Sequence, residues 1–178
     1  MRVLYRLRQF WRTLTAQSVS PELEQALTLL NPQQKALFDQ LQPGEKAHAF
    51  EMVRKLIEQG EHQPDLLVAA MLHDVGKIHY PLHPVERAVV VLVKALSPVL
   101  ACRWAGLPAG GWEALPGWRK AFVLAEHHAA WGAELARQAG VSPLTESLIR
   151  EHPHPTSPTM DGVNGSLLHK LWVVDNES

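Results

Sequence analysis

The sequence predicts an all-α fold. Apolar residues recur at intervals of three and four positions along most of the chain, which is the pattern of helices that bury one face. No stretch alternates apolar and polar residues for long, and the one β-branched run, residues 89–93, lies within a helical pattern. The length of 178 residues, with 46% hydrophobic and 20% charged residues, suits one folded domain.

Capping and breaking residues give the expected helix boundaries. Asn31-Pro32 and Ser142-Pro143 each pair a capping residue with proline, which favours a helix start, whereas Gly140 favours a helix end. Gln42-Pro43-Gly44 is interpreted as a break. The expected helices cover residues 22–30, 32–41, 45–59, 65–75, 85–96, 99–104, 118–138, 143–152 and 166–175, with connections at 106–117 and 154–165. The stretch 65–75 is apolar on nearly every side, which predicts the buried central helix.

The first residues differ in character from the rest. Within residues 1–15, the apolar side chains at positions 3, 4, 7, 10, 11 and 14 form one helical stripe, and four arginines lie elsewhere. We interpret residues 1–19 as an amphipathic basic helix and residues 20–178 as the main domain. Packing of this helix on its own domain or in a homodimer is the favoured interpretation, and contact with an anionic membrane surface is the alternative.

Charge and cysteine content exclude several classes of protein. With 17 basic and 18 acidic residues the net charge is -1, so the chain has no general attraction for nucleic acid. Cys102 is the sole cysteine and cannot form an internal disulfide, which favours a reducing compartment. No apolar run reaches the roughly 18 residues of a membrane span, and no signal peptide is evident. These features predict a cytoplasmic protein.

Several of the ten histidines fall on apolar helix faces, where a polar side chain needs a partner. Asp74 follows His73 in the last turn of the central helix, where a carboxylate meets the negative helix end and requires a cation. For any one histidine, a hydrogen-bonded core position is the alternative. The six residues in such positions are His48, His73, Asp74, His128, His152 and Asp175.

Four imidazoles and two carboxylates directed at one core predict a metal site. This donor set suits iron or manganese, with zinc, cobalt, nickel or magnesium as alternatives, and it suffices for two divalent ions. Gly132, one turn after His128, removes a side chain that would crowd the same face. His79, His83 and His127 stay outside the predicted ligand set, His62 and His169 are expected to face solvent, and His154 is not assigned to the set.

Other side chains have two interpretations each. Arg87 and Lys94, seven residues apart, either line an anionic pocket or lie on an exposed face. Trp104, Trp112 and Trp118 form a predicted cluster around the glycine-rich loop. These tryptophans either stack on a nucleobase or, as burial statistics favour, pack on the core.

The motif Leu72-His73-Asp74-Val75-Gly76-Lys77, with His48 before it and Asp175 on a late helix, resembles the HD-domain metal-dependent phosphohydrolase superfamily. The resemblance spans residues 33–175 and implies an HD-domain helical bundle, with metal bound by these two histidines and two aspartates. His128 with Gly132, and His152 at a helix end, resemble the further ligands of dinuclear members. The spacing is most similar to small stand-alone proteins of the dinucleoside tetraphosphate hydrolase type.

The resemblance implies hydrolysis of a phosphoester or phosphoanhydride, in a nucleotide or dinucleotide, by a metal-bound hydroxide. Asp74 would bridge the ions and act with Lys77 in catalysis. By their placement, Lys77, Arg87 and His154 are also candidate substrate contacts. The alternatives are a cation at a helix C-terminus for Lys77 and, for His154, a metal ligand, a group behind the ligands or a loop residue. A cyclic-dinucleotide phosphodiesterase is disfavoured, because Pro153 separates His152 from His154 and residues 161–165 lack a tyrosine-proline pair. The alternative of a different class is a non-catalytic module that binds a nucleotide or a protein.

Overall fold

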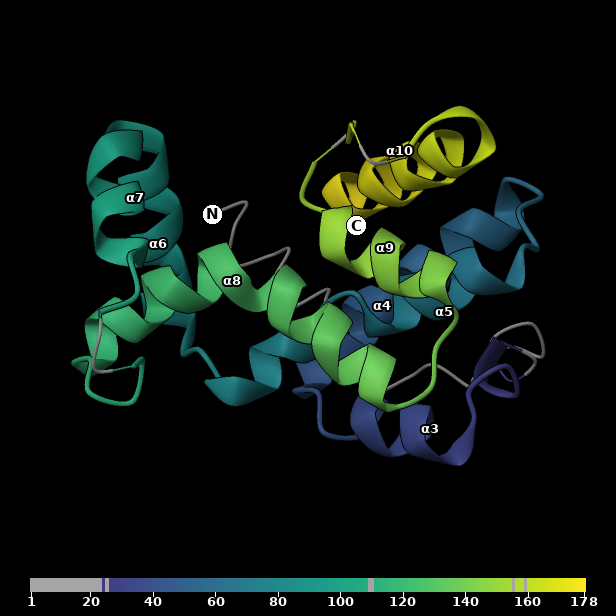
Figure 1. Cartoon of the computed structure of the whole chain (residues 1–178), viewed down its shortest axis with the longest axis horizontal. Helices are drawn as coiled ribbons and strands as arrows, with labels where there is room; N and C mark the ends of the chain where they lie inside the picture. The colour runs from purple at the N-terminus through teal and green to yellow at the C-terminus, as the bar shows by residue number, and fades with distance from the viewer. Residues whose placement is uncertain (1–23, 25, 109–110, 155, 159) are drawn as a thin grey trace, which may run out of the picture.

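The computed structural model describes residue 24 and residues 26–108, 111–154, 156–158 and 160–178, and it confirms the all-α prediction (Figure 1). Across these ranges the chain forms helices joined by short connections, with a single isolated β-bridge between Ser157 and Met160. The elements are α3 (Pro32–Phe38), α4 (Pro43–Glu58), α5 (Pro64–Leu72), the 3-10 helix η1 (Val75–His79), α6 (Pro84–Leu96), α7 (Pro98–Ala105), α8 (Gly117–Gln138), α9 (Pro143–Glu151) and α10 (Gly162–Glu177).

Proline at the first helical position starts six of these helices, because its fixed φ suits a helix start and its missing N–H has no partner there anyway. Side-chain caps complete several starts: Asn31 accepts from the backbone N–H groups of Gln33 and Gln34, and the Ser142 hydroxyl accepts from Thr145 N–H. The predicted break between α3 and α4 is present but lies earlier than residues 42–44, at residues 39–42, because Pro43 begins α4 with Gln42 as its N-cap.

Other predicted boundaries also shift. The stretch expected as one helix over 65–75 divides into α5 and η1, with His73 and Asp74 at the junction. α3 ends at Phe38, and tighter i to i+3 turns carry the chain on to Leu41. α10 begins at Gly162, ahead of the expected residue 166.

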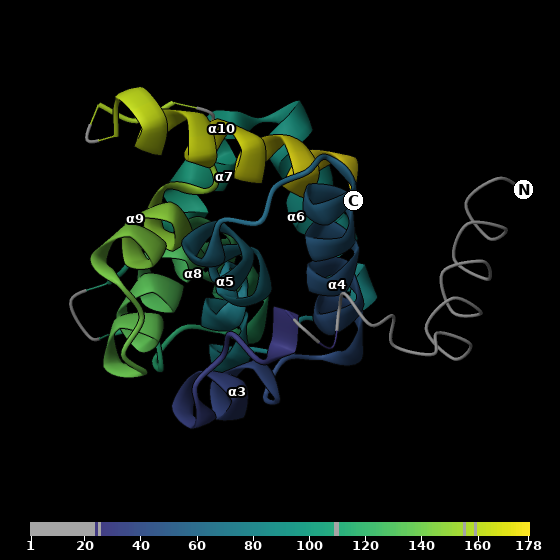
Figure 2. The same ribbon diagram turned by 90° about the vertical axis from the view of Figure 1, so that its right-hand side faces the viewer.

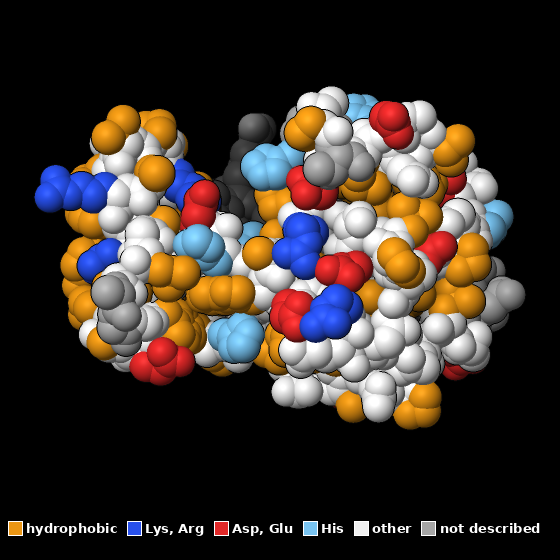
Figure 3. Space-filling view, viewed as in Figure 1, with side chains coloured by type: hydrophobic (Ala, Val, Ile, Leu, Met, Phe, Trp, Pro, Cys, Tyr) orange, Lys and Arg blue, Asp and Glu red, His pale blue; other side chains and the backbone are white. Residues whose placement is uncertain are grey.

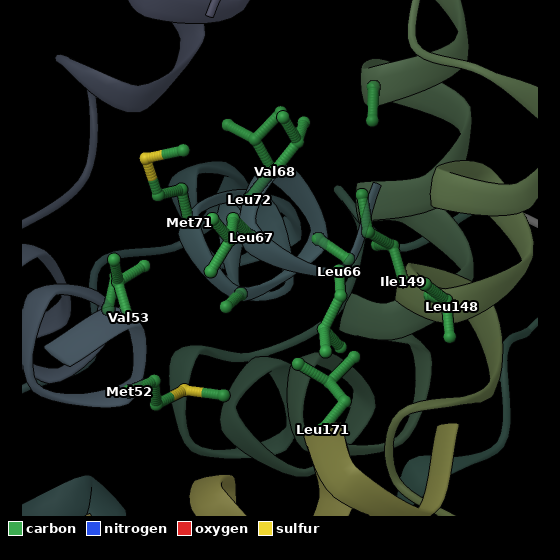
Figure 4. Packing of buried hydrophobic residues seen from close by; sticks show 14 of the residues in the cluster. Met52, Val53, Leu66, Leu67, Val68, Met71, Leu72, Leu148, Ile149 and Leu171 are labelled. Carbon is green, nitrogen blue, oxygen red and sulfur yellow. The ribbon is translucent and has the colours of Figure 1, made fainter. Parts of the chain in front are cut away.

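The core forms around α5, whose residues 66–72 are all buried. Figure 2 shows α4, α9 and α10 around this helix, with α3 at one end. In Figure 4, Met52 and Val53 from α4, Ile149 from α9 and Leu171 from α10 surround its side chains. Full burial of each such side chain contributes about 1.5–3 kcal/mol. The prediction that this stretch is the central helix is therefore confirmed.

η1 crosses α8 at very short range because two glycines meet there. A Cβ placed on Gly76 would lie 2.0 Å from the carbonyl oxygen of His128, and one on Gly132 would lie 3.0 Å from the backbone nitrogen of Gly76. The sequence predicts that Gly132 relieves crowding beside His128, but its role is to let the backbone of α8 contact the backbone of η1 directly. This contact brings Asp74 and His128 together.

The α6–α7 hairpin forms a smaller lobe on the first half of α8 (Figures 1 and 3). Val90, Ala101 and Phe122 belong to its separate apolar cluster. Several apolar side chains of the lobe are exposed, among them Val85, Leu96 and Val99. Cys102 is exposed as well. The lobe places the start of α6 beside the start of α4.

None of the described helices is long and apolar enough to cross a bilayer. The predicted basic helix, residues 1–19, lies outside the described residues, and so do the dimer and membrane contacts predicted for it. Of the expected helix over 22–30, the described residues Glu24, Ala26 and Leu27 are helical and a turn follows them.

We expect Gly76→Ala to lower the free energy of unfolding by roughly 3 kcal/mol, because its methyl group would overlap the His128 carbonyl and force η1 away from α8. Gly44→Ala is the matched control: its Cβ would meet nothing within 4 Å, so stability should be unchanged or rise by up to about 1 kcal/mol. Urea unfolding followed by circular dichroism measures both. Equal stability of the two variants would contradict the close crossing.

Candidate metal centre

Five helices and one junction direct the predicted ligands to one point. His48 comes from the middle of α4, and His128 from the middle of α8. His73 and His152 are the C-caps of α5 and α9, and Asp74 is the N-cap of η1. Asp175 lies near the end of α10. All six side chains predicted from the sequence are brought together.

The donor atoms form three overlapping groups, within each of which the atoms lie no more than 4.8 Å apart. Asp74 belongs to two of them, so its carboxylate links the two sides of the centre. The groups are His48 with His73 and Asp74, Asp74 with His128 and His152, and His73 with His152 and Asp175. Clusters of histidine and aspartate that could hold a metal ion are thus present.

Three of the histidines are oriented by the backbone behind them. Nδ1 of His73 donates to the carbonyl of Ala70 at 2.9 Å, and Nδ1 of His152 donates to that of Ile149 at 2.7 Å. Nδ1 of His128 donates to the carbonyl of Leu124 at 3.2 Å. Since a carbonyl can only accept, each Nδ1 carries a hydrogen and each neutral ring presents the lone pair of Nε2 to the centre. This is the tautomer required for binding a metal ion through Nε2.

Among the buried side-chain nitrogen and oxygen atoms of the described residues, only Nε2 of His73 lacks a hydrogen-bond partner. It lies 3.3 Å from Oδ2 of Asp74 and 3.6 Å from Oδ1 of Asp175. A neutral His73 would therefore point its lone pair at carboxylate oxygens inside the protein, an arrangement that favours a positive charge between them. A proton or a metal cation would satisfy it.

His48 lies at the more open side of the cluster. It donates from Nε2 to Oδ1 of Asp175 at 2.9 Å, and about a quarter of each side chain is exposed. This pair closes the ring of donors between α4 and α10. If this Nε2 atom bound a metal ion, it would have to lose its hydrogen, so metal binding would replace this hydrogen bond.

The buried groups have displaced pKa values. Burial lowers the pKa of His128 to about 4, against the opposing charge of Asp74. Burial, aided by neighbouring His73, lowers the pKa of His152 to about 3. Burial would raise the pKa of Asp74, but His73 and Lys77 outweigh it and hold that pKa well below its usual range. Two neutral imidazoles beside an ionised carboxylate are the protonation states that metal binding needs.

Sequence reasoning missed Glu45, a buried carboxylate in the first turn of α4. It forms ion pairs with Arg87 and, at 3.6 Å, with Lys77, whose Nζ also donates to Oδ2 of Asp74 at 2.5 Å. The available signal was its position three residues before His48, which places both on one face of α4. Glu45 therefore links Lys77 and Arg87 to the cluster.

A pocket of about 730 Å³ opens onto the centre. Lys77 and Arg87 line it together with the predicted ligands His48, Asp74, His128, His152 and Asp175, and the starts of α4 and α6 contribute further lining residues. The predicted substrate contacts at Lys77 and Arg87 thus face the cluster. His154 is exposed and is not among the described lining residues, and Lys94 lies instead beside Glu126 at 3.8 Å.

The histidines left out of the ligand set take other positions. His83 lines the pocket, and His79 contacts tryptophan rings. His127 stacks on Trp131 with ring centroids 5.7 Å apart. His62 and His169 are exposed, as predicted.

The tryptophans predicted as one cluster separate into two. Trp104 and Trp118 pack together against Phe122, with centroids 5.1 Å apart. Trp112 instead packs on Trp131, at 5.3 Å. The reason is that Trp104 and Trp118 belong to the lobe of α7 and the start of α8, whereas Trp112 lies in the loop beside η1.

Searches among protein families, curated proteins and solved structures find no match to this chain.

The lowered pKa of His128 gives a pH dependence to the metal-free protein. The unfolded imidazole binds a proton below about 6.5, whereas the folded one does so only near 4. Stability from this group is therefore complete above 6.5 and is lost as the pH falls toward 4, by about 1.4 kcal/mol for each unit. His73, whose pKa is raised because Asp74 outweighs burial, acts in the opposite direction. The comparison is therefore made between variants.

Urea unfolding with a chelator present, at pH 7.5 and 5.5, measures the effect. Between these values the wild type should lose about 1.4 kcal/mol more of its free energy of unfolding than His128→Gln. His169→Gln, on the exposed face of α10, controls for the substitution and should follow the wild type. If His128→Gln loses as much stability as the wild type, His128 does not exclude a proton when folded.

Proposed function

We propose that this protein is a metal-dependent phosphohydrolase with two divalent ions. The observation that supports this most is the orphaned Nε2 of His73, held between two carboxylates inside interlocking donor groups that share Asp74. A folded chain rarely leaves a buried polar atom unpaired without a use for it. The resemblance of the His73-Asp74 motif to the HD-domain superfamily supports the same function.

The residues present fit such a centre. His48, His73 and Asp74 would hold one ion, and Asp74, His128 and His152 the other, with Asp175 completing the set. Imidazole and carboxylate donors favour iron or manganese over softer thiolate-bound metals. Divalent ions bound there supply Lewis acidity, which activates water and offsets charge on a phosphoryl group.

Lys77 and Arg87 supply the positive charge that a phosphorylated substrate needs outside the ligand set. Lys77 lies between the predicted ligands and the rest of the pocket, where it donates to Asp74 and is close to Glu45. The Arg87 side chain is 40% exposed and lines the pocket, and one of its terminal nitrogens donates to Glu45 and to Gln42. An anionic substrate entering there would be oriented by Lys77 near the ions and by Arg87 further out.

The proposed bond is a phosphoester or phosphoanhydride, and the substrate a nucleotide or dinucleotide, as the resemblance implies. The pocket volume of about 730 Å³ is within the range of sites for ligands of that size. The alternative is a module that binds such a ligand without turnover. The two proposals differ in the effect of replacing Asp74: the hydrolase would lose metal and activity, whereas the binding module would keep its function.

Asp74→Asn should remove metal and reduce hydrolysis roughly a thousandfold, because the neutral amide cannot bridge two cations. Elemental mass spectrometry of protein purified without oxygen or chelator gives the metal per chain. Assays with a dinucleoside tetraphosphate and with bis(p-nitrophenyl) phosphate give the activity. Asp39→Asn, on the exposed end of α3, is the matched control and should behave as the wild type.

The metal content itself divides the alternatives. Near two equivalents of iron or manganese in the wild type supports the proposal. One equivalent would mean a mononuclear enzyme and would assign His128 and His152 to other roles. No metal after reconstitution would overturn the hydrolase and leave the binding module.

Lys77→Met should lower kcat/KM about 10²–10³-fold while the metal content stays at the wild-type level, because a positioned charge is lost and the ligands remain. Methionine keeps much of the length of the lysine side chain, and thermal unfolding verifies that the variant folds. Lys94→Met, whose lysine lies outside the pocket, controls for loss of charge on the lobe. An equal loss of activity in both variants would remove Lys77 from the site.

A further inference from the structure

A second cavity also borders η1 and shares none of its described lining residues with the pocket at the candidate metal centre. It has a volume of about 440 Å³ and is lined by His79 of η1, Trp131 of α8, and Leu107, Pro108, Trp112 and Glu113 of the connection before α8. Its volume is within the range of small-molecule sites. Lys77 and His79, two residues apart on η1, line the metal-facing pocket and this one respectively.

Three aromatic rings form one side of this cavity. Trp112 and Trp131 meet edge to face with centroids 5.3 Å apart. The ring of His79 meets Trp131 at 5.4 Å and Trp112 at 6.5 Å, nearly perpendicular to both. Edge-to-face contacts hold each ring in a defined orientation. The cavity is therefore lined by aromatic surface that is already positioned.

These rings are not simply part of a core. Trp112 and Trp131 are partly exposed and His79 is exposed, and none of the three belongs to either apolar cluster of the described chain. Trp104 differs, because it packs on the buried ring of Phe122 within the apolar cluster of the lobe. Aromatic side chains that line an open cavity expose apolar area that a ligand would cover.

The charged groups around the cavity narrow the choice of ligand. Glu113 brings a carboxylate, which accepts hydrogen bonds and repels anions. Lys120 lies over the Trp112 ring, 5.3 Å from its centroid, and no lysine or arginine is among the described lining residues. A flat ligand with N–H groups could stack on the aromatic rings and donate to the carboxylate. A free phosphate could not stack, and the carboxylate would repel it.

We propose that this cavity binds a nucleobase, with guanine preferred. The base would stack on the Trp112–Trp131 pair, as bases stack on aromatic side chains in nucleic-acid-binding proteins. Glu113 would accept from the adjacent ring N–H and amino group of guanine, two donors that one carboxylate can pair with. The site deepens the proposed function, since a base held beside η1 would belong to a nucleotide substrate, but binding of the base itself needs no metal.

Isothermal titration of the full-length, metal-free protein with guanosine, inosine and adenosine tests the site. Guanosine should bind more tightly than inosine, which lacks the amino group, and than adenosine. Trp112→Ala should weaken guanosine binding roughly tenfold or more, because a stacking ring is lost. Trp118→Ala is the matched control, since Trp118 is exposed and lies outside the cavity, and its affinity should equal that of the wild type.

Glu113→Gln keeps the test valid if Trp112→Ala fails to fold, because Glu113 is exposed and its substitution leaves the rings in place. This variant should lose the preference for guanosine over inosine. Absence of nucleoside binding by the wild type would overturn the proposal, and so would equal weakening by Trp112→Ala and Trp118→Ala. Binding of choline in place of nucleosides would reassign the rings to a cation.

The outcome is separable from that of the hydrolase proposal. Asp74→Asn should bind guanosine with wild-type affinity, because Asp74 lines the other pocket. A metal-free, inactive protein that binds guanosine would refute the hydrolase and keep the base site. An active protein without nucleoside affinity would support the hydrolase and refute the base site.

Discussion

The carboxylate of Asp74 is buried, with the residue 3% exposed, where the most apolar of the described helices ends and a 3-10 helix begins. Such a charge costs several kcal/mol of desolvation unless partners surround it. Its partners come from separate elements: His73 from α5, Lys77 from η1 and His128 from α8. The relative positions of these three elements are therefore constrained by one side chain, because displacement of any of them would leave the charge less well paired.

Backbone geometry satisfies that constraint. Gly76 and Gly132 let η1 and α8 approach until their main chains touch, so the carboxylate and the imidazole of His128 face each other. The carbonyls one turn back along α5, α8 and α9 then hold the rings of His73, His128 and His152 by their Nδ1 atoms. Orientation at the centre thus derives mainly from helix ends and main-chain groups, which move less than side chains in loops.

η1 is the element that connects the two cavities. Lys77 adjoins Asp74 and the buried Glu45, so that pocket combines groups that could hold a metal ion with positive charge. His79 meets Trp112 and Trp131, so the second pocket is aromatic and carries a carboxylate. The proposed phosphate chemistry and base stacking make opposite demands on a surface, and residues of one five-residue helix line both pockets.

The sequence by itself determined the helices and the six donors, because helical periodicity and capping are local and mark which face of each helix is buried. Asp74 could be recognised as needing a cation from its place in the chain. Only the tertiary structure decided that α5 ends before His73, that Glu45 joins Lys77 to Arg87, and that Trp112 pairs with Trp131 rather than with Trp104. These features depend on how closely helices cross and where connections return, which are non-local distances that no spacing along the chain encodes.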